Sequence, residues 1–213
     1  MNKSVRNEKI ISILGLIVIV LLFILFSYIT RRNIFGINDY LSNGIGGMFL
    51  YVFIIIVAVV IAPVSATPLL PIASNSWGWI FAGVLSIIGW SIGATIAFSL
   101  ARKYGIWMIS RWVNLGKLHR IEKLIPKRNL FLSVVFLRMA LPVDILSYAL
   151  GLFSKMSLRS YILATIIGIT PFAFILAYLG SVTLIIQLTF LFIGVVVLFV
   201  GYSMAIKKLK NIS

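Results

Sequence analysis

Long apolar segments separated by short polar connections make up most of this 213-residue chain. A membrane-spanning α-helix needs about 20 predominantly apolar residues. The first such segment, residues 10–29, is too long for a typical signal-peptide core. No small-residue cleavage pattern follows it, so we expect it to remain as an uncleaved helix. Spanning helices are predicted at residues 10–29, 80–101, 158–179 and 183–206.

Two further apolar segments are interrupted by prolines. The first covers residues 48–74 and the second covers residues 129–153. Proline removes a backbone donor and breaks a helix, and irregular backbone at membrane depth is tolerated only where protein or a water-filled cavity covers it. We therefore expect two re-entrant hairpins. Their prolines are Pro63, Pro68 and Pro71 in the first and Pro142 in the second.

Composition and charge place the chain in a membrane. Hydrophobic residues make up 62% and charged residues 11%, which excludes a water-soluble globular domain. The formal net charge is +15, but the basic residues flank apolar segments, as membrane topology requires, so a nucleic-acid partner is not expected. With two hairpins and four spans, most of the 19 lysines and arginines fall on the side that holds both chain termini. By the positive-inside rule that side is cytoplasmic.

The predicted fold is therefore an all-α polytopic membrane protein with four spanning helices and two opposed, proline-broken re-entrant hairpins. A hairpin followed by a span occurs twice, so the two halves form an inverted repeat, a recurrent plan of transporters. We expect an interfacial turn at residues 75–79 and a kink at Pro171. The domain organisation is an anchor helix and loop over residues 1–47, a membrane domain over 48–181, and a last span with a basic tail over 182–213.

The region 102–128 is the longest polar stretch, with eight lysines and arginines against one glutamate. Apolar residues recur in it at near-helical spacing. One interpretation is a basic amphipathic helix lying on an anionic leaflet. The other is an ordinary cytoplasmic loop of the positive-inside rule, and the pattern leaves both open.

Small residues recur every fourth position in the second predicted span. Gly89 and Gly93 begin this ridge and Ala97 and Ala101 continue it, which allows another helix to approach closely. The ridge would serve internal packing or a homo-oligomer equally well. The chain contains no cysteine, which excludes disulfides and thiolate metal sites, and we expect neither a metal nor a cofactor.

The candidate chemistry is concentrated around the second proline break. Arg138 and Asp144 are the only charged residues between Arg128 and Lys155, and ionisable groups at membrane depth usually mark a pathway or a ligand site. Arg138 offers a planar set of donors suited to a phosphate. Asp144 could neutralise it without ligand or take up a proton. Alternatively, the two residues form a permanent pair that only holds the hairpin.

Five other residues at the breaks are candidates for lining a polar path: Ser65, Thr67, Asn75, Ser147 and Tyr148. The alternative role of these five residues is to satisfy backbone groups that the prolines leave without partners. Pro142, between Arg138 and Asp144, is assigned to the same substrate-binding site.

The motif Phe136-Leu-x-Arg138-Met-x-x-Pro142, followed by Tyr148-x-x-Gly151 and Ala164-Thr-x-x-Gly168-x-x-Pro171, resembles the DedA/VTT-domain superfamily, in particular its SNARE-associated Golgi protein branch. The resemblance covers roughly residues 48–181. It implies opposed re-entrant hairpins, lipid translocation and, for bacterial members, recycling of a polyprenyl-phosphate carrier or redistribution of phospholipids. It also implies that Arg138 binds phosphate. Thr165, Gly168 and Pro171 are interpreted as kink and packing positions, and Gly151 is assigned a structural role.

The chain departs from the family pattern in two places. Residues 48–76 contain no acidic residue, and Asp144 follows Pro142 where many members have a second arginine. Proton coupling through a carboxylate in the first hairpin is therefore not expected.

The leading hypothesis is a lipid transporter or scramblase for a phosphate-bearing lipid, in a bacterial plasma membrane. The alternatives are a proton- or ion-coupled small-solute transporter and a non-transporting factor in membrane organisation. An enzyme is not expected, because four acidic residues and one histidine are scattered along the chain and supply no catalytic cluster.

Overall fold

The computed structural model describes residues 17–29, 32, 44–61, 65–109, 129–140 and 143–190, with the backbone alone at 106–109, 140, 143 and 144. It forms two units, residues 1–181 and 182–213. Every regular element among the described residues is helical, as the sequence predicts. In the second unit the described part is a short helix over residues 184–190, so the predicted last span lies largely outside the described residues.

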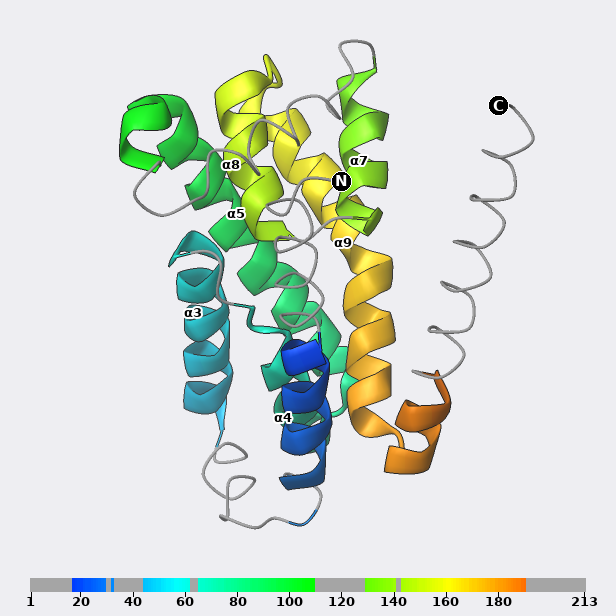
Figure 1. Cartoon of the computed structure of the whole chain (residues 1–213). Coiled ribbons are helices and arrows are strands. Elements are labelled where there is room, and N and C mark those ends of the chain that lie inside the picture. The colour runs from blue at the N-terminus through cyan, green and yellow to red at the C-terminus, as the bar shows by residue number, and fades with distance from the viewer. Residues whose placement is uncertain are drawn as a thin grey trace, which may run out of the picture. The chain divides into compact units, whose positions relative to one another are not determined.

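Two long helices form the centre of the first unit (Figure 1). Helix α5 covers Trp79–Ile109 and helix α9 covers Leu158–Ser181. They are antiparallel: Tyr161 near the start of α9 reaches Ala94 of α5, whereas Phe174 packs on Gly83. Two stretches are long and apolar enough to cross a membrane, Trp79–Gly105 and Leu158–Ser181, in agreement with two of the four predicted spans.

The first broken segment gives helix α3, Ile45–Ile61, then a 3-10 turn η1, Thr67–Leu69, and helix α4, Leu70–Trp77. Helix α3 runs parallel to α5, because Tyr51 bonds Ser86 while Val59 packs against Gly93. The start of α5 therefore lies at the end of the unit where α3 starts. The chain returns to that end through η1 and α4.

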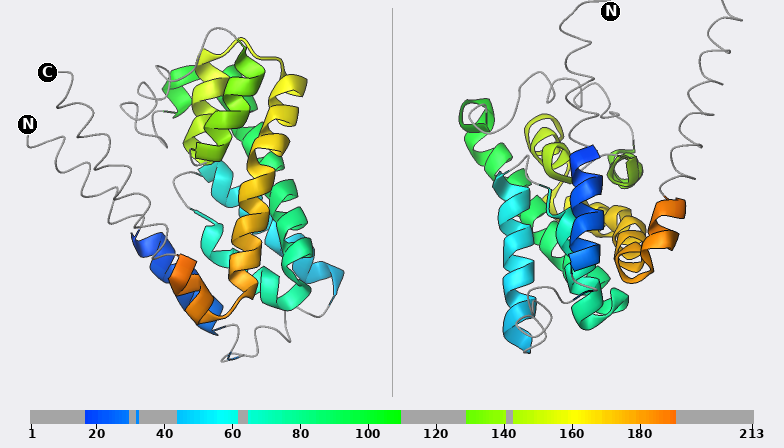
Figure 2. Two further views of the ribbon diagram at one scale, coloured as in Figure 1. Left: turned by 90° about the vertical axis from the view of Figure 1, so that its right-hand side faces the viewer. Right: turned by 60° about the horizontal axis from the view of Figure 1, so that its bottom comes forward.

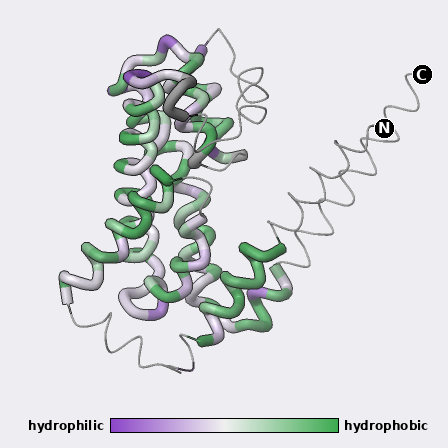
Figure 3. Tube along the Cα trace, turned by 60° about the vertical axis from the view of Figure 1, so that its left-hand side comes forward, coloured by the Kyte–Doolittle hydropathy of each residue, from purple (hydrophilic) through white to green (hydrophobic). Residues whose placement is uncertain are grey.

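The second broken segment repeats this arrangement from the other end. Helix α7, Leu130–Ala140, is followed by α8, Val143–Phe153, which leads to the start of α9. Figure 1 shows α7 and α8 beside the half of the unit opposite to α3 and α4, and the left view of Figure 2 agrees. In Figure 3, hydrophobic residues extend along the helices, and hydrophilic residues are prominent at the end where α8 passes into α9.

The two halves of the described unit, α3–α5 and α7–α9, pack against each other. The first limbs, α3 and α7, pack on the long helix of their own half. Helix α8 packs on α5 of the other half, and α4 packs on both α9 and α5. A Cβ at Gly151 of α8 would lie 2.5 Å from the Phe98 carbonyl oxygen, and one at Gly180 would lie 2.9 Å from the Cα of Pro71. The glycines therefore permit backbone contact between the two halves.

The small-residue ridge of α5 is covered by the chain itself. Gly89 and Gly93 lie against Ile55 and Val59 of α3, and Ala97 and Ala101 pack with Tyr148 and Ala149 of α8. All four ridge residues are buried, so within the described residues the ridge serves internal packing.

Several predicted boundaries need correction. Residues 75–77 are the last turn of α4, and the turn expected at 75–79 is confined to Gly78, whose φ of 83° favours glycine. Helix α5 continues past residue 101 to a break at Gly105, with φ 68°. Arg102 and Lys103 therefore belong to the spanning helix. The basic region beyond residue 109 and the first part of the predicted anchor helix lie outside the described residues, which hold Ile17–Ile29 of that anchor.

Substituting Gly151 by alanine should destabilise the protein, because the added methyl would approach Phe98 and Ala101 within 2.6 Å and force α8 away from α5. Overpacking of this kind costs about 1–3 kcal/mol. The measurement is thermal unfolding of the purified protein in detergent. Gly46→Ala is the matched control, since nothing lies within 4 Å of a Cβ there; equal melting temperatures for the two variants would contradict the packing described.

Candidate functional site

Arg138 lies in the last turn of α7 and is only 2% exposed. It is buried because α7 lies directly against α9. A Cβ at Gly168 of α9 would stand 2.6 Å from the Arg138 Cβ and 2.9 Å from the Val135 carbonyl oxygen. Glycine at position 168 therefore permits the approach that encloses the guanidinium.

Tyr161 of α9 is the centre of the contacts around Arg138. The Arg138 Nη2 donates to the Tyr161 hydroxyl and, at 3.1 Å, to the Ser147 hydroxyl of α8. The Tyr161 hydroxyl donates in turn to the Ala94 carbonyl oxygen of α5 at 3.0 Å. The guanidinium carbon lies 5.3 Å from the centroid of the Tyr161 ring. The Arg138 cluster, comprising Arg138, Ser147, Tyr161 and Ala94, thus joins four helices.

The Tyr161 ring has little freedom to move. It is fully buried and stacks on Phe98 of α5, with centroids 4.0 Å apart and planes 19° from parallel. Offset or stacked aromatic pairs contribute about 0.5–1.5 kcal/mol beyond the area that they bury. The stacking fixes the hydroxyl between Arg138 and Ala94.

Two buried hydroxyls beside this cluster have no hydrogen-bond partner in the part of the chain that the structure describes, those of Thr165 and Ser91. Thr165 is one turn after Tyr161 and one turn before Gly168, so it shares the α9 face that meets Arg138. Ser91 is one turn before Ala94 on α5. Buried polar groups are nearly always satisfied, so these two hydroxyls are candidates for contact with a bound polar group.

Tyr148 connects the two broken segments. Its hydroxyl donates to the carbonyl oxygen of Val60, in the last turn of α3, and its side chain is 4% exposed. A carbonyl at the end of a helix has no intrahelical partner. Tyr148 therefore satisfies backbone at the end of α3 from the second broken segment, and α8 lies beside the end of α3.

Ser65 and Thr67 have local contacts. The Ser65 hydroxyl donates to the Thr67 hydroxyl at 3.0 Å and accepts from the Thr67 backbone N–H at 3.4 Å. These two bonds fix the start of η1. Pro68 lies in the first turn of η1, and Pro71 lies in the first turn of α4. Proline suits that position because its N–H would be unsatisfied there anyway.

The remaining predicted site residues are placed as follows. Pro63, Pro142 and the side chain of Asp144 lie outside the described residues. The Arg138–Asp144 pair therefore stays a prediction. Pro171 lies inside helix α9, which is continuous over Leu158–Ser181. The expected kink there stays a prediction.

Two important residues were missed by the sequence reasoning, Tyr161 and Arg102. Arg102 donates to the carbonyl oxygens of Met156 and Ser154 at 2.6 and 2.7 Å, and its guanidinium lies 4.3 Å from the Phe98 ring centroid. It closes the α8–α9 connection onto α5. A tyrosine within a predicted span was a detectable signal, because its hydroxyl needs a partner when buried.

Apolar helices of spanning length packed around a buried arginine define a helical membrane protein. The family model described as VTT domain matches residues 44–182. The chain belongs to this family, the domain of the DedA and SNARE-associated proteins. No curated protein and no solved structure matches the chain.

Tyr161→Phe should lower stability by about 1–3 kcal/mol, because it leaves a buried charged donor and the Ala94 carbonyl without their shared partner. Thermal unfolding in detergent measures the effect. Tyr178→Phe on the same helix is the control, since that side chain is 48% exposed. A Tyr161→Phe protein as stable as wild type would show that the hydroxyl does not hold the Arg138 cluster together.

Proposed function

We propose that this protein moves a phosphate-bearing lipid between membrane leaflets, as a transporter or scramblase, and that Arg138 binds the head group. In the proposed topology α5 and α9 cross the bilayer with segments 10–29 and 183–206. The pairs α3–α4 and α7–α8 are re-entrant hairpins from opposite faces. The termini and the region after α5 are cytoplasmic, in a bacterial plasma membrane.

The observation that carries the proposal is the burial of Arg138 where four helices meet. A guanidinium remains charged when buried, and enclosing it in apolar surroundings is costly. Helix packing alone would be served by an apolar side chain at this position. A buried cation where the second broken segment meets α5 and α9 is instead suited to an anionic ligand.

A phosphate can replace the neutral groups now in contact with Arg138. The hydroxyl oxygens of Ser147 and Tyr161 accept from Nη2. Phosphate oxygens would accept from the same donor, and their negative charge adds a Coulombic attraction to the guanidinium that a neutral hydroxyl oxygen does not offer. The hydroxyls of Thr165 and Ser91 add donors on the α9 and α5 sides.

The arrangement of the two halves supports movement around this site. The halves meet through glycine-mediated helix contacts and the Tyr148–Val60 bond between α8 and the end of α3. Inverted repeats of this kind alternate access by rocking one repeat against the other around a site near the midplane. A hydrophobic lipid tail would remain in the bilayer while the head group passes Arg138.

Lipid movement in proteoliposomes tests the proposal, using fluorescent polyprenyl phosphate and phosphatidylethanolamine and an impermeant quencher. Arg138→Lys keeps the charge but loses the planar set of donors. It should slow movement of the preferred lipid at least about tenfold, since a hydrogen bond to a charged group contributes about 1.5–3 kcal/mol. Thermal unfolding establishes that the variant remains folded.

Thr165→Val separates binding from structure. Because the Thr165 hydroxyl has no partner in the described structure, removing it should leave stability equal or higher while lipid movement falls. Thr170→Val is the matched control on α9, where the hydroxyl donates to the Ile166 carbonyl.

Wild-type rates in folded Arg138→Lys and Thr165→Val would contradict the proposed site. Proton flux that is lost in Asp144→Asn, without lipid movement, would favour ion coupling, and neither activity in folded protein would favour a role in membrane organisation.

A further inference from the structure

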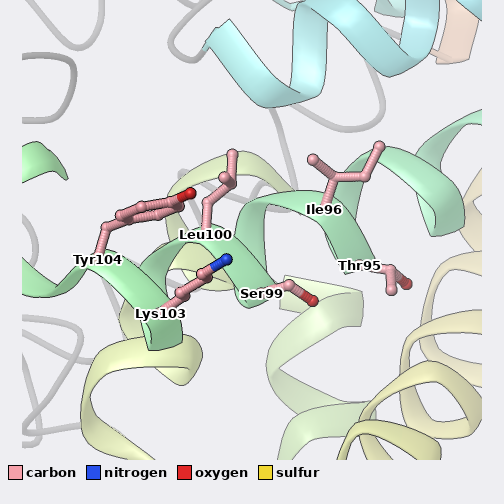
Figure 4. A pocket seen from close by; sticks show the side chains of 6 residues that line it. All are labelled: Thr95, Ile96, Ser99, Leu100, Lys103 and Tyr104. Carbon is pink, nitrogen blue, oxygen red and sulfur yellow. The ribbon is translucent and has the colours of Figure 1, made fainter.

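A groove of about 300 Å³ lies along one face of α5, and no residue of the Arg138 cluster lines it (Figure 4). Two adjacent rows of side chains line it, each with a spacing of four residues along the helix. It is lined by Thr95, Ile96, Ser99, Leu100, Lys103 and Tyr104. We call it the α5 groove.

The groove changes from apolar to basic along the helix. Ile96 and Leu100 provide hydrocarbon at one end, and Lys103 and Tyr104 form the other. Eight residues separate Thr95 from Lys103, or about 12 Å of helix. The Lys103 Nζ lies 5.4 Å from the centroid of the Tyr104 ring, and Figure 4 shows Ser99 and Lys103 next to each other along α5.

The basic end of the groove coincides with the end of the spanning segment. Trp79–Gly105 is the candidate span, so Lys103 and Tyr104 lie in its last turn. Their neighbour Arg102 bonds the α8–α9 connection, where hydrophilic residues gather. Lysine and tyrosine at such a position are typical of the membrane–water interface.

We infer that the α5 groove binds one anionic phospholipid of the surrounding leaflet. The head-group phosphate lies at Lys103, with the Ser99 hydroxyl one turn away, and an acyl chain lies along Leu100 and Ile96. The exposure of the groove favours a lipid as its occupant. Ile96 is 38% and Tyr104 49% exposed on a helix of spanning length, so the groove would face the lipid of the bilayer. The charge of Lys103 favours an anionic lipid over a neutral one. This site is independent of lipid transport through Arg138.

Native mass spectrometry of the full-length protein tests the inference. The protein is reconstituted in nanodiscs of phosphatidylcholine with a minor share of phosphatidylglycerol, and the phosphatidylglycerol that it retains on release is counted. Lys103→Gln should reduce retention about fivefold, the factor expected for one basic residue at an anionic membrane surface. Leu100→Trp should reduce it as well, because the larger side chain fills the groove and leaves the charge in place.

Lys155→Gln is the matched control, since Lys155 is an exposed lysine outside the groove, in the connection that Arg102 binds. Retention should stay at the wild-type level in this variant. Equal losses in Lys103→Gln and Lys155→Gln would overturn the inference in favour of diffuse attraction. Unchanged retention in Lys103→Gln and Leu100→Trp would overturn it in favour of a groove covered by another part of the chain.

Discussion

The packing of this protein depends on satisfying one buried guanidinium. Arg138 is 2% exposed, and an uncompensated charge in apolar surroundings costs several kcal/mol. Tyr161 meets part of this requirement by accepting from Arg138 and donating to Ala94. The bond requires α7 to lie on α9 and α9 to lie on α5. Gly168 and the stacking of Tyr161 on Phe98 make both approaches possible.

The same requirement explains where the other polar side chains are placed. Breaking a helix in apolar surroundings leaves carbonyls that water cannot satisfy. Tyr148 binds the Val60 carbonyl at the end of α3, Asn75 binds the carbonyls of Pro71 and Gly180, and Arg102 binds the connection after α8. Apart from the local Asn75–Pro71 bond, each joins segments far apart in the sequence. Polar residues in this apolar chain therefore satisfy carbonyls at helix ends and connections.

Segment length and small-residue spacing were sufficient to predict the all-helical fold, the two long helices and a packing role for Gly89 and Gly93. Element ends were less predictable, because they depend on single backbone conformations: Gly78 and Gly105 end their helices with positive φ. Tyr161 could not be recognised as the centre of the site. Its partners lie 23 and 67 residues away in the chain, and only the folded arrangement of α5, α7 and α9 brings them together.

The two halves share their packing but differ in their chemistry. In both, the first limb packs on its own long helix and the second limb contacts the long helix of the other half, although α4 packs on its own α5 as well. Yet residues 48–76 contain no charged side chain, whereas the second segment carries Arg138 and Asp144. At the first break Ser65 and Thr67 bond each other, while at the second a charged donor contacts hydroxyls on two other helices. A head-group site in such a fold would therefore be built mainly by the second half, and the first half would supply the surface against which it moves.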